Sequence, residues 1–298
     1  MVGELVEYAG KPEWLDARRK VVTATDVGRI VGVSKWGGPL EVFGEKMGMQ
    51  QDENERMLIG RELQTGIASA YHQLRTKLTG EACDIKHVSP FALQWGPRPR
   101  HAASLDCMQR LGDAPDWHPL EIKSTAAYVV EPYDEWLTQV QWQMYVTETR
   151  RATIAALRAG DDIEWWDIER DDSVIQPLVE AADAFLAQNL DRAEPPPPGA
   201  HDWKGVKRLY PDAGLGVEIT FGIEELDLAT HHLAVKEEIA GLYMRKEQLE
   251  AQLMAKMGLA EIAYLPNGTR ITWKNQARKS YVVPPTNARV FKIEKAPR

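Results

Sequence analysis

The sequence predicts an α/β protein, with a mixed β-sheet flanked by helices and a mostly helical C-terminal part. In the first two thirds, short alternating segments typical of strands lie between segments whose apolar residues recur at helical spacing. Four consecutive prolines at 195–198 then interrupt the pattern, and a long run of helix-forming residues follows them. The 298 residues are enough for one large domain and a smaller one.

The first elements that the sequence predicts along the chain are helices. Thr23 or Thr25 can cap a short helix that runs to residue 31. A second short helix, over 40–47, precedes a glycine suited to a C-cap. Over 54–78 the apolar residues keep helical spacing up to Gly80, which predicts a long, half-buried helix.

Strands and helices alternate after Gly80. Alternating segments at 83–88, 91–95 and 101–106, separated by proline and glycine, predict an antiparallel meander. A polar loop then leads to a further strand. The later predicted elements are a strand at 119–124, a helix at 134–149, a hairpin of 152–158 with 163–169, and a helix at 174–190.

The proline run marks the predicted domain border, because polyproline is extended and cannot continue a helix. We predict a core at 1–193, a linker at 194–200 and a C-terminal helical region at 201–298. Apolar residues in that region repeat every seven positions, which predicts a coiled-coil-like seam or one arm folded on another. The seam comprises Leu228, Val235, Leu242 and Leu249, with Ile239 and Leu253 between them, while His232 and Lys246 interrupt its second line.

The chain ends on a basic stretch. From Gly268 to Arg298 there are eight basic residues against one acid, Glu294, interleaved with aromatic residues. Lysine and arginine beside tryptophan and tyrosine are typical of surfaces that contact phosphates and bases. We therefore favour nucleic-acid or oligomer contact over a merely solvated terminus, and a hairpin is predicted at 266–268.

The composition of the chain argues against several classes of protein. A net charge of −8 argues against coating nucleic acid over the whole surface, although it leaves room for a local basic groove. Two cysteines, Cys83 and Cys107, are too few for a disulfide framework or a four-thiolate zinc site. No apolar run is long enough to span a bilayer and the start has no signal-peptide pattern, so we expect a cytoplasmic protein without a membrane partner.

A carboxylate and an ammonium stand side by side on one predicted strand. In 120–123, period-two alternation sends Glu121 and Lys123 to one face of the strand. If the strand that ends at Asp106 pairs antiparallel with it, Asp106 lies near Glu121. Two converging carboxylates repel each other unless they share a divalent cation or a proton.

These residues supply what phosphodiester hydrolysis requires: oxygen ligands for Mg²⁺, a more acidic water and a cation near the phosphate. On the next predicted helix, Gln141 and Tyr145 are four residues apart and so share a face, from which they can reach the metal site. Glu-x-Lys alone is more often a solvated strand face. The joint arrangement favours a metal-dependent nuclease over that alternative.

The same residues resemble the lambda-exonuclease or YqaJ-type viral recombinase family, within the PD-(D/E)xK nucleases. The resemblance spans about 14–169, and its motifs follow the family's order. They are Trp14, Arg18, Thr23-Ala24-Thr25-Asp26-Val27, Arg100, Ser104, Asp106, Glu121-Ile122-Lys123, Gln139-Val140-Gln141 and Tyr145. It implies a restriction-endonuclease-like core, and a C-terminal extension like those of YqaJ-type prophage relatives.

Roles for individual residues are implied by that resemblance. Asp106, Glu121 and the Ile122 carbonyl would bind Mg²⁺, or Mn²⁺ in its place, and Lys123 would be catalytic with Gln141 and Tyr145. Arg18, Thr25 and Ser104 would contact DNA phosphate, the first two at a 5′ end. Gln64 stands near the place where the family usually has a metal-proximal glutamate, and Cys107 follows Asp106 where a glycine is usual.

The implied activity is a Mg²⁺-dependent exonuclease acting 5′ to 3′ on double-stranded DNA ends. It would leave 3′ single strands for an annealing protein, in the host cytoplasm if phage-encoded, and a homo-oligomeric ring is expected. Two alternatives remain open: a structure-specific endonuclease on the same core, and a catalytically impaired DNA-binding or scaffold protein, which Gln64 and Cys107 make conceivable.

Overall fold

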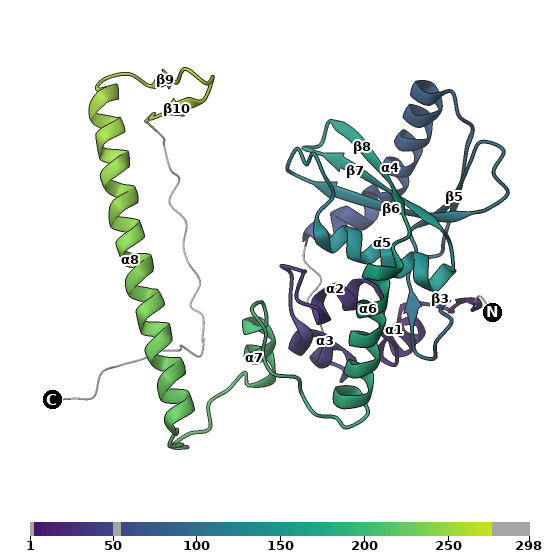
Figure 1. The fold of residues 1–298 in the computed structure, drawn as a ribbon, viewed down its shortest axis with the longest axis horizontal. Helices are drawn as coiled ribbons and strands as arrows, with labels where there is room; N and C mark the ends of the chain where they lie inside the picture. The colour runs from purple at the N-terminus through teal and green to yellow at the C-terminus, as the bar shows by residue number, and fades with distance from the viewer. Residues whose placement is uncertain (1–2, 50–54, 276–298) are drawn as a thin grey trace. The chain divides into compact units, whose positions relative to one another are not determined.

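A five-stranded mixed sheet lies within residues 1–210, between helices of the same part of the chain (Figure 1). The structure, a computed structural model, describes residues 3–49 and 55–275. The strands lie in the order β2 (Cys83–His87), β5 (Cys107–Leu111), β6 (His118–Thr125), β7 (Arg151–Arg158) and β8 (Asp162–Glu169). Neighbours are antiparallel except β6 and β7, which are parallel. The helix α5 (Asp134–Thr147) makes the crossover that such a pair requires.

The predicted meander is wrong in its first pairing and right in its second, since the segments at 91–95 and 101–106 do pair antiparallel. The strand β2 pairs with β5 of the main sheet, whereas β3 (Ala92–Trp95) pairs with β1 (Leu5–Glu7) and β4 (Ala102–Ala103) in a separate small sheet. The strand β5 falls inside the segment predicted as a polar loop. Its alternation is real, but one of its three buried positions is the polar Gln109, which weakened the apolar signal.

Three of the helices before β2 follow their predicted segments: α2 (Ala24–Ile30), α3 (Pro39–Lys46) and α4 (Glu55–Thr79). The helix α1 (Lys11–Arg19) was not predicted. Thr23, rather than Thr25, is the N-cap of α2, and its backbone nitrogen donates to Asp26 Oδ2 over 2.9 Å. This reciprocal capping box fixes where α2 begins. After β8, the helix α6 (Asp172–Phe185) continues into a π-helical turn, η1 (Leu186–Leu190).

Helices cover both faces of the sheet. On one face, Tyr71 of α4 packs with Leu120 and Ile122 of β6. On the other face, Val140 and Met144 of α5 pack against β7. The strand β6 therefore buries its even-numbered apolar residues under α4 and presents its odd-numbered residues, which include Glu121 and Lys123, toward α5.

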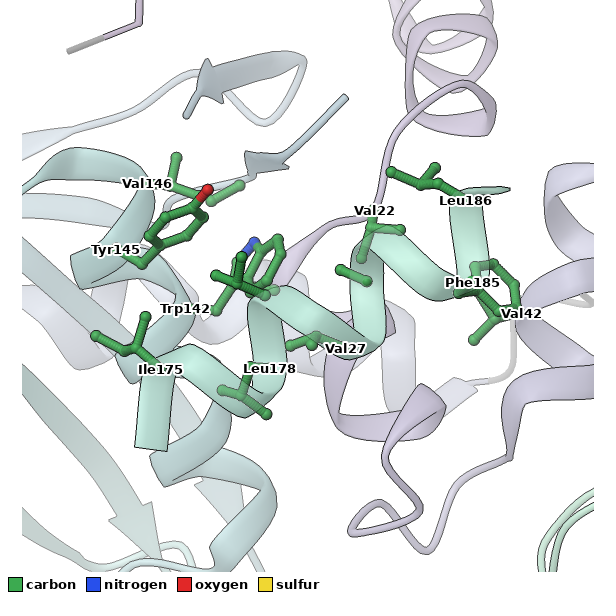
Figure 2. Packing of buried hydrophobic residues seen from close by; sticks show 14 of the residues in the cluster. Val22, Val27, Val42, Trp142, Tyr145, Val146, Ile175, Leu178, Phe185 and Leu186 are labelled. Carbon is green, nitrogen blue, oxygen red and sulfur yellow. The ribbon is translucent and has the colours of Figure 1, made fainter. Parts of the chain in front are cut away.

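A second core lies on the far side of α5 (Figure 2). There Trp142, Tyr145 and Val146 pack among apolar residues of α2, α3 and α6, including Val27 and Leu178. The helix α5 is thus covered on two opposite sides, and nearly all of its residues from Trp136 to Thr147 are buried. Because a helix that is buried on all sides has no polar face, its sequence does not indicate which side packs on the sheet.

The chain divides into compact units at 1–210 and 211–298. The division lies beyond the predicted linker at 194–200, because the segment after the prolines is held on the first unit. Asp202 is fully buried, and its carboxylate accepts hydrogen bonds from the backbone nitrogens of Leu40 (3.2 Å) and Glu41 (3.0 Å) at the start of α3. This cap, supplied from far along the chain, precedes α7 (Trp203–Leu209), which packs on α3.

The second unit contains α8 (Ile223–Met257) and a hairpin of β9 (Ile262–Tyr264) with β10 (Arg270–Thr272). Both were predicted, the hairpin from its turn at 266–268. The basic tail falls mostly at 276–298, outside the described residues. Within the described ranges, none of the helices has the length and apolar character to cross a membrane.

A buried polar network ties α4 to the sheet. The Tyr71 hydroxyl donates to Gln109 Oε1 (2.8 Å), and Gln109 Nε2 lies 3.0 Å from His118 Nε2. On the neighbouring strands, the Thr153 hydroxyl of β7 donates a hydrogen bond to the Asp167 carboxylate of β8 over 2.6 Å. Because the Gln109 amide nitrogen is a donor, His118 accepts at Nε2 and is neutral. Burial lowers the pKa of His118 to about 4.

This imidazole should make stability depend on pH. Its folded pKa of about 4 lies below the ordinary value of 6.5, so the unfolded chain takes up the proton first as pH falls. The free energy of unfolding should therefore fall by roughly 1–2 kcal/mol between pH 7 and pH 5. Urea unfolding of the wild type and His118→Gln at both pH values isolates this contribution, and equal pH dependence in the two proteins would refute it.

Candidate active site

Asp106 and Glu121 converge at one end of the β5–β6 ladder. Cys107, the first residue of β5, pairs with Leu120, which places Asp106 beside Glu121 in the antiparallel register. Asp106 thus lies at the start of a strand, not at the end of one as predicted, but its predicted neighbour is the same. Asp106 Oδ2 accepts a hydrogen bond from the Ile122 backbone nitrogen over 2.9 Å.

The Glu121 carboxylate is buried and receives three donors. Lys123 Nζ lies 2.7 Å from Oε1, Gln139 Nε2 donates to the same oxygen over 2.6 Å, and Gln143 Nε2 donates to Oε2 over 2.6 Å. Gln139 also accepts from Lys123 Nζ over 2.7 Å. The two amides and the ammonium fix the orientation of Glu121 while leaving it able to accept further contacts.

Asp106 has a strongly perturbed acidity. Burial, and then the negative charge of Glu121, raise the pKa of Asp106 to about 8, against the opposing influence of Lys123. A side-chain hydrogen bond from Gln64 of α4 also favours the charged form. The structure therefore brings Gln64 to the acids. Of the predicted site residues, it gathers Gln64, Asp106, Glu121 and Lys123.

Gln141 and Tyr145 do not join this group. Gln141 Nε2 donates to the Glu169 carbonyl over 2.8 Å, and Gln141 Oε1 accepts from the Asp171 nitrogen over 2.9 Å. The Tyr145 hydroxyl lies 3.0 Å from Nδ1 of the buried His101, and its ring belongs to the second core (Figure 2). Both are structural contacts that connect α5 to the strands and helices behind it.

Helical geometry explains the difference. Residues two apart on a helix point in nearly opposite directions, whereas residues four apart are neighbours. Gln139 and Gln143 therefore share the face of α5 that packs on the sheet, and Gln141 faces away from it. The signal that could have found the right pair was the sheet-facing stripe of Val140 and Met144, which Gln139 and Gln143 flank.

Two of the three predicted phosphate ligands, Arg18 and Thr25, form a separate polar group at the end of α1. Arg18 Nη2 donates to Thr23 Oγ1 (3.2 Å) and to Thr25 Oγ1 (3.1 Å), and its guanidinium lies 4.7 Å from the Trp14 ring centroid. Ser104 precedes Asp106 by two positions, and its buried hydroxyl oxygen has no hydrogen-bond partner in the described part of the chain. No contact among the described residues joins Arg18 or Thr25 to the acids directly.

The two cysteines are buried, as expected, and burial raises the pKa of Cys107 to about 12. Neither residue is a metal thiolate candidate. Over 3–49 and 55–275, no group of three histidine, cysteine or acidic side chains is arranged to hold a metal ion. A cation here would have to use two carboxylates together with neutral oxygens.

The donor set nevertheless fits Mg²⁺. This ion prefers hard oxygen ligands, commonly binds through one or two carboxylates and keeps several waters. The N–H and C=O groups of one strand residue point to the same side, so the Ile122 carbonyl lies on the side of Asp106, to which its nitrogen donates. A divalent cation would also relieve the repulsion that raises the Asp106 pKa.

Comparisons with known proteins show what the chain is similar to. Residues 13–150 match the family model of the YqaJ-like viral recombinase domain. The uncharacterized protein YqaJ of Bacillus subtilis (strain 168) is 25% identical over 281 residues, which cover 89% of this chain and 83% of that protein.

Two solved structures are also similar. An alkaline exonuclease from Laribacter hongkongensis is 24% identical, with a TM-score of 0.49 over 62% of this chain and 95% of its own. A phage-related exonuclease from Haemophilus somnus 129PT is 15% identical, with a TM-score of 0.40 over 58% of this chain and 96% of its own. The matched family domain contains the whole acid–lysine cluster. Through residues 13–150, this chain is similar to the YqaJ-like viral recombinase domains.

Proposed function

We propose that the chain is a Mg²⁺-dependent DNA exonuclease that degrades one strand of a duplex from its end in the 5′ to 3′ direction. The 3′ single strands left behind would serve an annealing protein in phage-type recombination, and Mn²⁺ could replace Mg²⁺. One observation supports this above all: Asp106, Glu121 and Lys123 meet at a single, partly buried point. The similar solved proteins described as exonucleases point the same way.

Asp106, Glu121 and the Ile122 carbonyl would hold the cation. When bound, Mg²⁺ would supply Lewis-acid chemistry that makes a water more acidic and offsets phosphate charge. Lys123 can orient the attacking water or the phosphate, because its ammonium is fixed by both Glu121 and Gln139 at 2.7 Å. Gln139 and Gln143 act through Glu121 and are positioning residues. Gln64 would set the orientation of Asp106.

Arg18 would recognise the 5′ end. Its guanidinium is held by the Thr23 and Thr25 hydroxyls and by the Trp14 ring, so it is already oriented, yet it stays partly exposed. A guanidinium in a fixed position matches the geometry of a phosphate. Ser104, whose hydroxyl lacks a partner, is a further candidate for a phosphate contact near Asp106.

The test is digestion of linear duplex DNA labelled at either end. We expect Mg²⁺-dependent loss of the 5′ label, no loss with EDTA, and faster degradation of 5′-phosphorylated than of 5′-hydroxyl ends. Covalently closed circular DNA is the control, since an exonuclease requires an end. Cleavage of the closed circle would favour an endonuclease instead, and indifference to the 5′ phosphate would count against the role of Arg18.

A further inference from the structure

The helix α8 is long and has no buried residue. It comprises 35 residues, about 50 Å at the rise of an α-helix. Apolar side chains along it stay open to solvent, among them Leu242 at 59% and Leu249 at 53% exposure. A helix of this length owes most of its stability to packing of an apolar face, and contiguous exposed apolar residues mark an interaction surface.

We propose that α8 pairs with α8 of a second copy of the chain as an antiparallel two-stranded coiled coil. Apolar residues recur in a strict heptad, whose two core positions are conventionally called d and a. The d residues are Leu228, Val235, Leu242 and Leu249, and the a residues are His232, Ile239, Lys246 and Leu253. The same seam on two identical helices can close on itself, as a two-fold interface requires.

The orientation follows from the polar a residues. In a parallel pair with the helices in register, Lys246 would meet the partner's Lys246, and His232 would meet the partner's His232. An antiparallel pair places a against d instead. With the two helices fully overlapped, Ile239 faces the partner's Leu242, Leu253 faces the partner's Leu228, and Lys246 faces the partner's Val235.

Lys246 can occupy an a position that faces an apolar residue of the partner helix. Its ammonium lies 2.9 Å from Glu250 Oε1 on the same helix, so its charge is matched before any association. The aliphatic stem can then cover an apolar neighbour while the charged end stays in water. The like charges that would face each other in the parallel pair are thereby separated.

Charges beside the seam favour the same register. The antiparallel overlap puts Glu238 opposite the partner's Arg245, and by symmetry this pair occurs twice. Both residues flank the a positions, where interhelical ion pairs set partner choice and orientation. Because each pair uses residues of one and the same helix, the surface is self-complementary and fits a second copy of this chain.

The oligomeric state of the full chain tests the proposal. Light scattering after size-exclusion chromatography should show that Leu242→Asp has half the molar mass of the wild type. A single chain has a mass of 33.6 kDa. Met244→Asp is the matched control: Met244 is 67% exposed but lies two residues along, on the outer face of the helix. It should keep the wild-type mass. Equal masses for all three proteins, or halving by Met244→Asp, would overturn the proposal.

Charge exchange tests the orientation without touching the apolar seam. Glu238→Arg alone should raise the dissociation constant by about tenfold, since it places two arginines face to face. Adding Arg245→Glu should restore it. In a parallel pair the same double variant would not recover, because the new carboxylate at 245 would face the partner's Glu250. Failure of the double variant to recover would therefore refute the antiparallel arrangement.

Discussion

Replacing Lys123 by alanine should reduce the rate of phosphodiester cleavage by about 10³-fold while the protein stays folded. Among the residues that the structure describes, the ammonium is the only cation in contact with Glu121, and it is held at 2.7 Å by Glu121 and Gln139. Without it, a metal ion held by the two carboxylates would have to offset the charge of a phosphate alone. Glu121 keeps its two amide donors, so we expect a modest change in stability. Initial rates on end-labelled linear duplex in Mg²⁺, with urea unfolding as the fold control, measure both effects.

Two of the three glutamines of α5, Gln139 and Gln141, make this test sharper. Gln139→Ala removes a donor to Glu121 and an acceptor for Lys123, and should slow cleavage by roughly 10–100-fold. Gln141→Ala, two residues along, should leave the rate within about twofold, although the loss of its contacts with Glu169 and Asp171 costs stability. The opposite order of effects, or undiminished cleavage by Lys123→Ala, would remove the acid–lysine cluster from the proposed chemistry.

Much of the fold could be predicted because local signals and tertiary structure agreed. The Thr23 cap, the helix-forming residues of α8 and the 266–268 turn each reflect short-range chemistry that is also found in the structure. Period-two alternation likewise placed Glu121 and Lys123 on one face of β6, since strand geometry leaves no other choice. Where one residue type and one spacing decide the outcome, a single sequence is enough.

The errors came from long-range burial. Gln109 is polar and fully buried because Tyr71 and His118 pair with it, so β5 did not look like a strand. The boundary after the prolines moved because Asp202 caps a helix from far along the chain. Gln141 was preferred over Gln139 because α5 is covered on both sides, and neither side is distinctive in sequence.

The pair of Lys46 and Asp26 shows how much such burial can matter. Lys46 Nζ lies 2.5 Å from Asp26 Oδ2, with side-chain exposures of 5% and 1%. Burial alone would raise the pKa of Asp26, but Lys46 and Arg29 bring it well below its usual range. Lys46 also donates to the Arg18 carbonyl over 2.9 Å, so the same ammonium holds the end of α1 that carries the proposed phosphate ligand.

Lys46→Met should therefore lower the free energy of unfolding by about 3 kcal/mol, because it leaves a buried carboxylate with less compensation. Urea unfolding followed by tryptophan fluorescence measures this in the first unit, where all the tryptophans but Trp273 lie. Lys20→Met is the control. Its 2.6 Å pair with Asp16 is exposed at 69% and 60%, so its loss should change the free energy of unfolding much less than the loss of the buried pair.

Asp26→Asn added to Lys46→Met distinguishes an unpaired charge from lost packing. Asparagine can still accept from the Thr23 nitrogen but carries no charge, so the double variant should recover part of the stability lost in Lys46→Met. If Lys46→Met costs no more than Lys20→Met, the buried pair does not stabilise the fold. Arg18 would then have to be held by Thr23, Thr25 and Trp14 alone, and the preference for 5′-phosphorylated ends should survive in Lys46→Met.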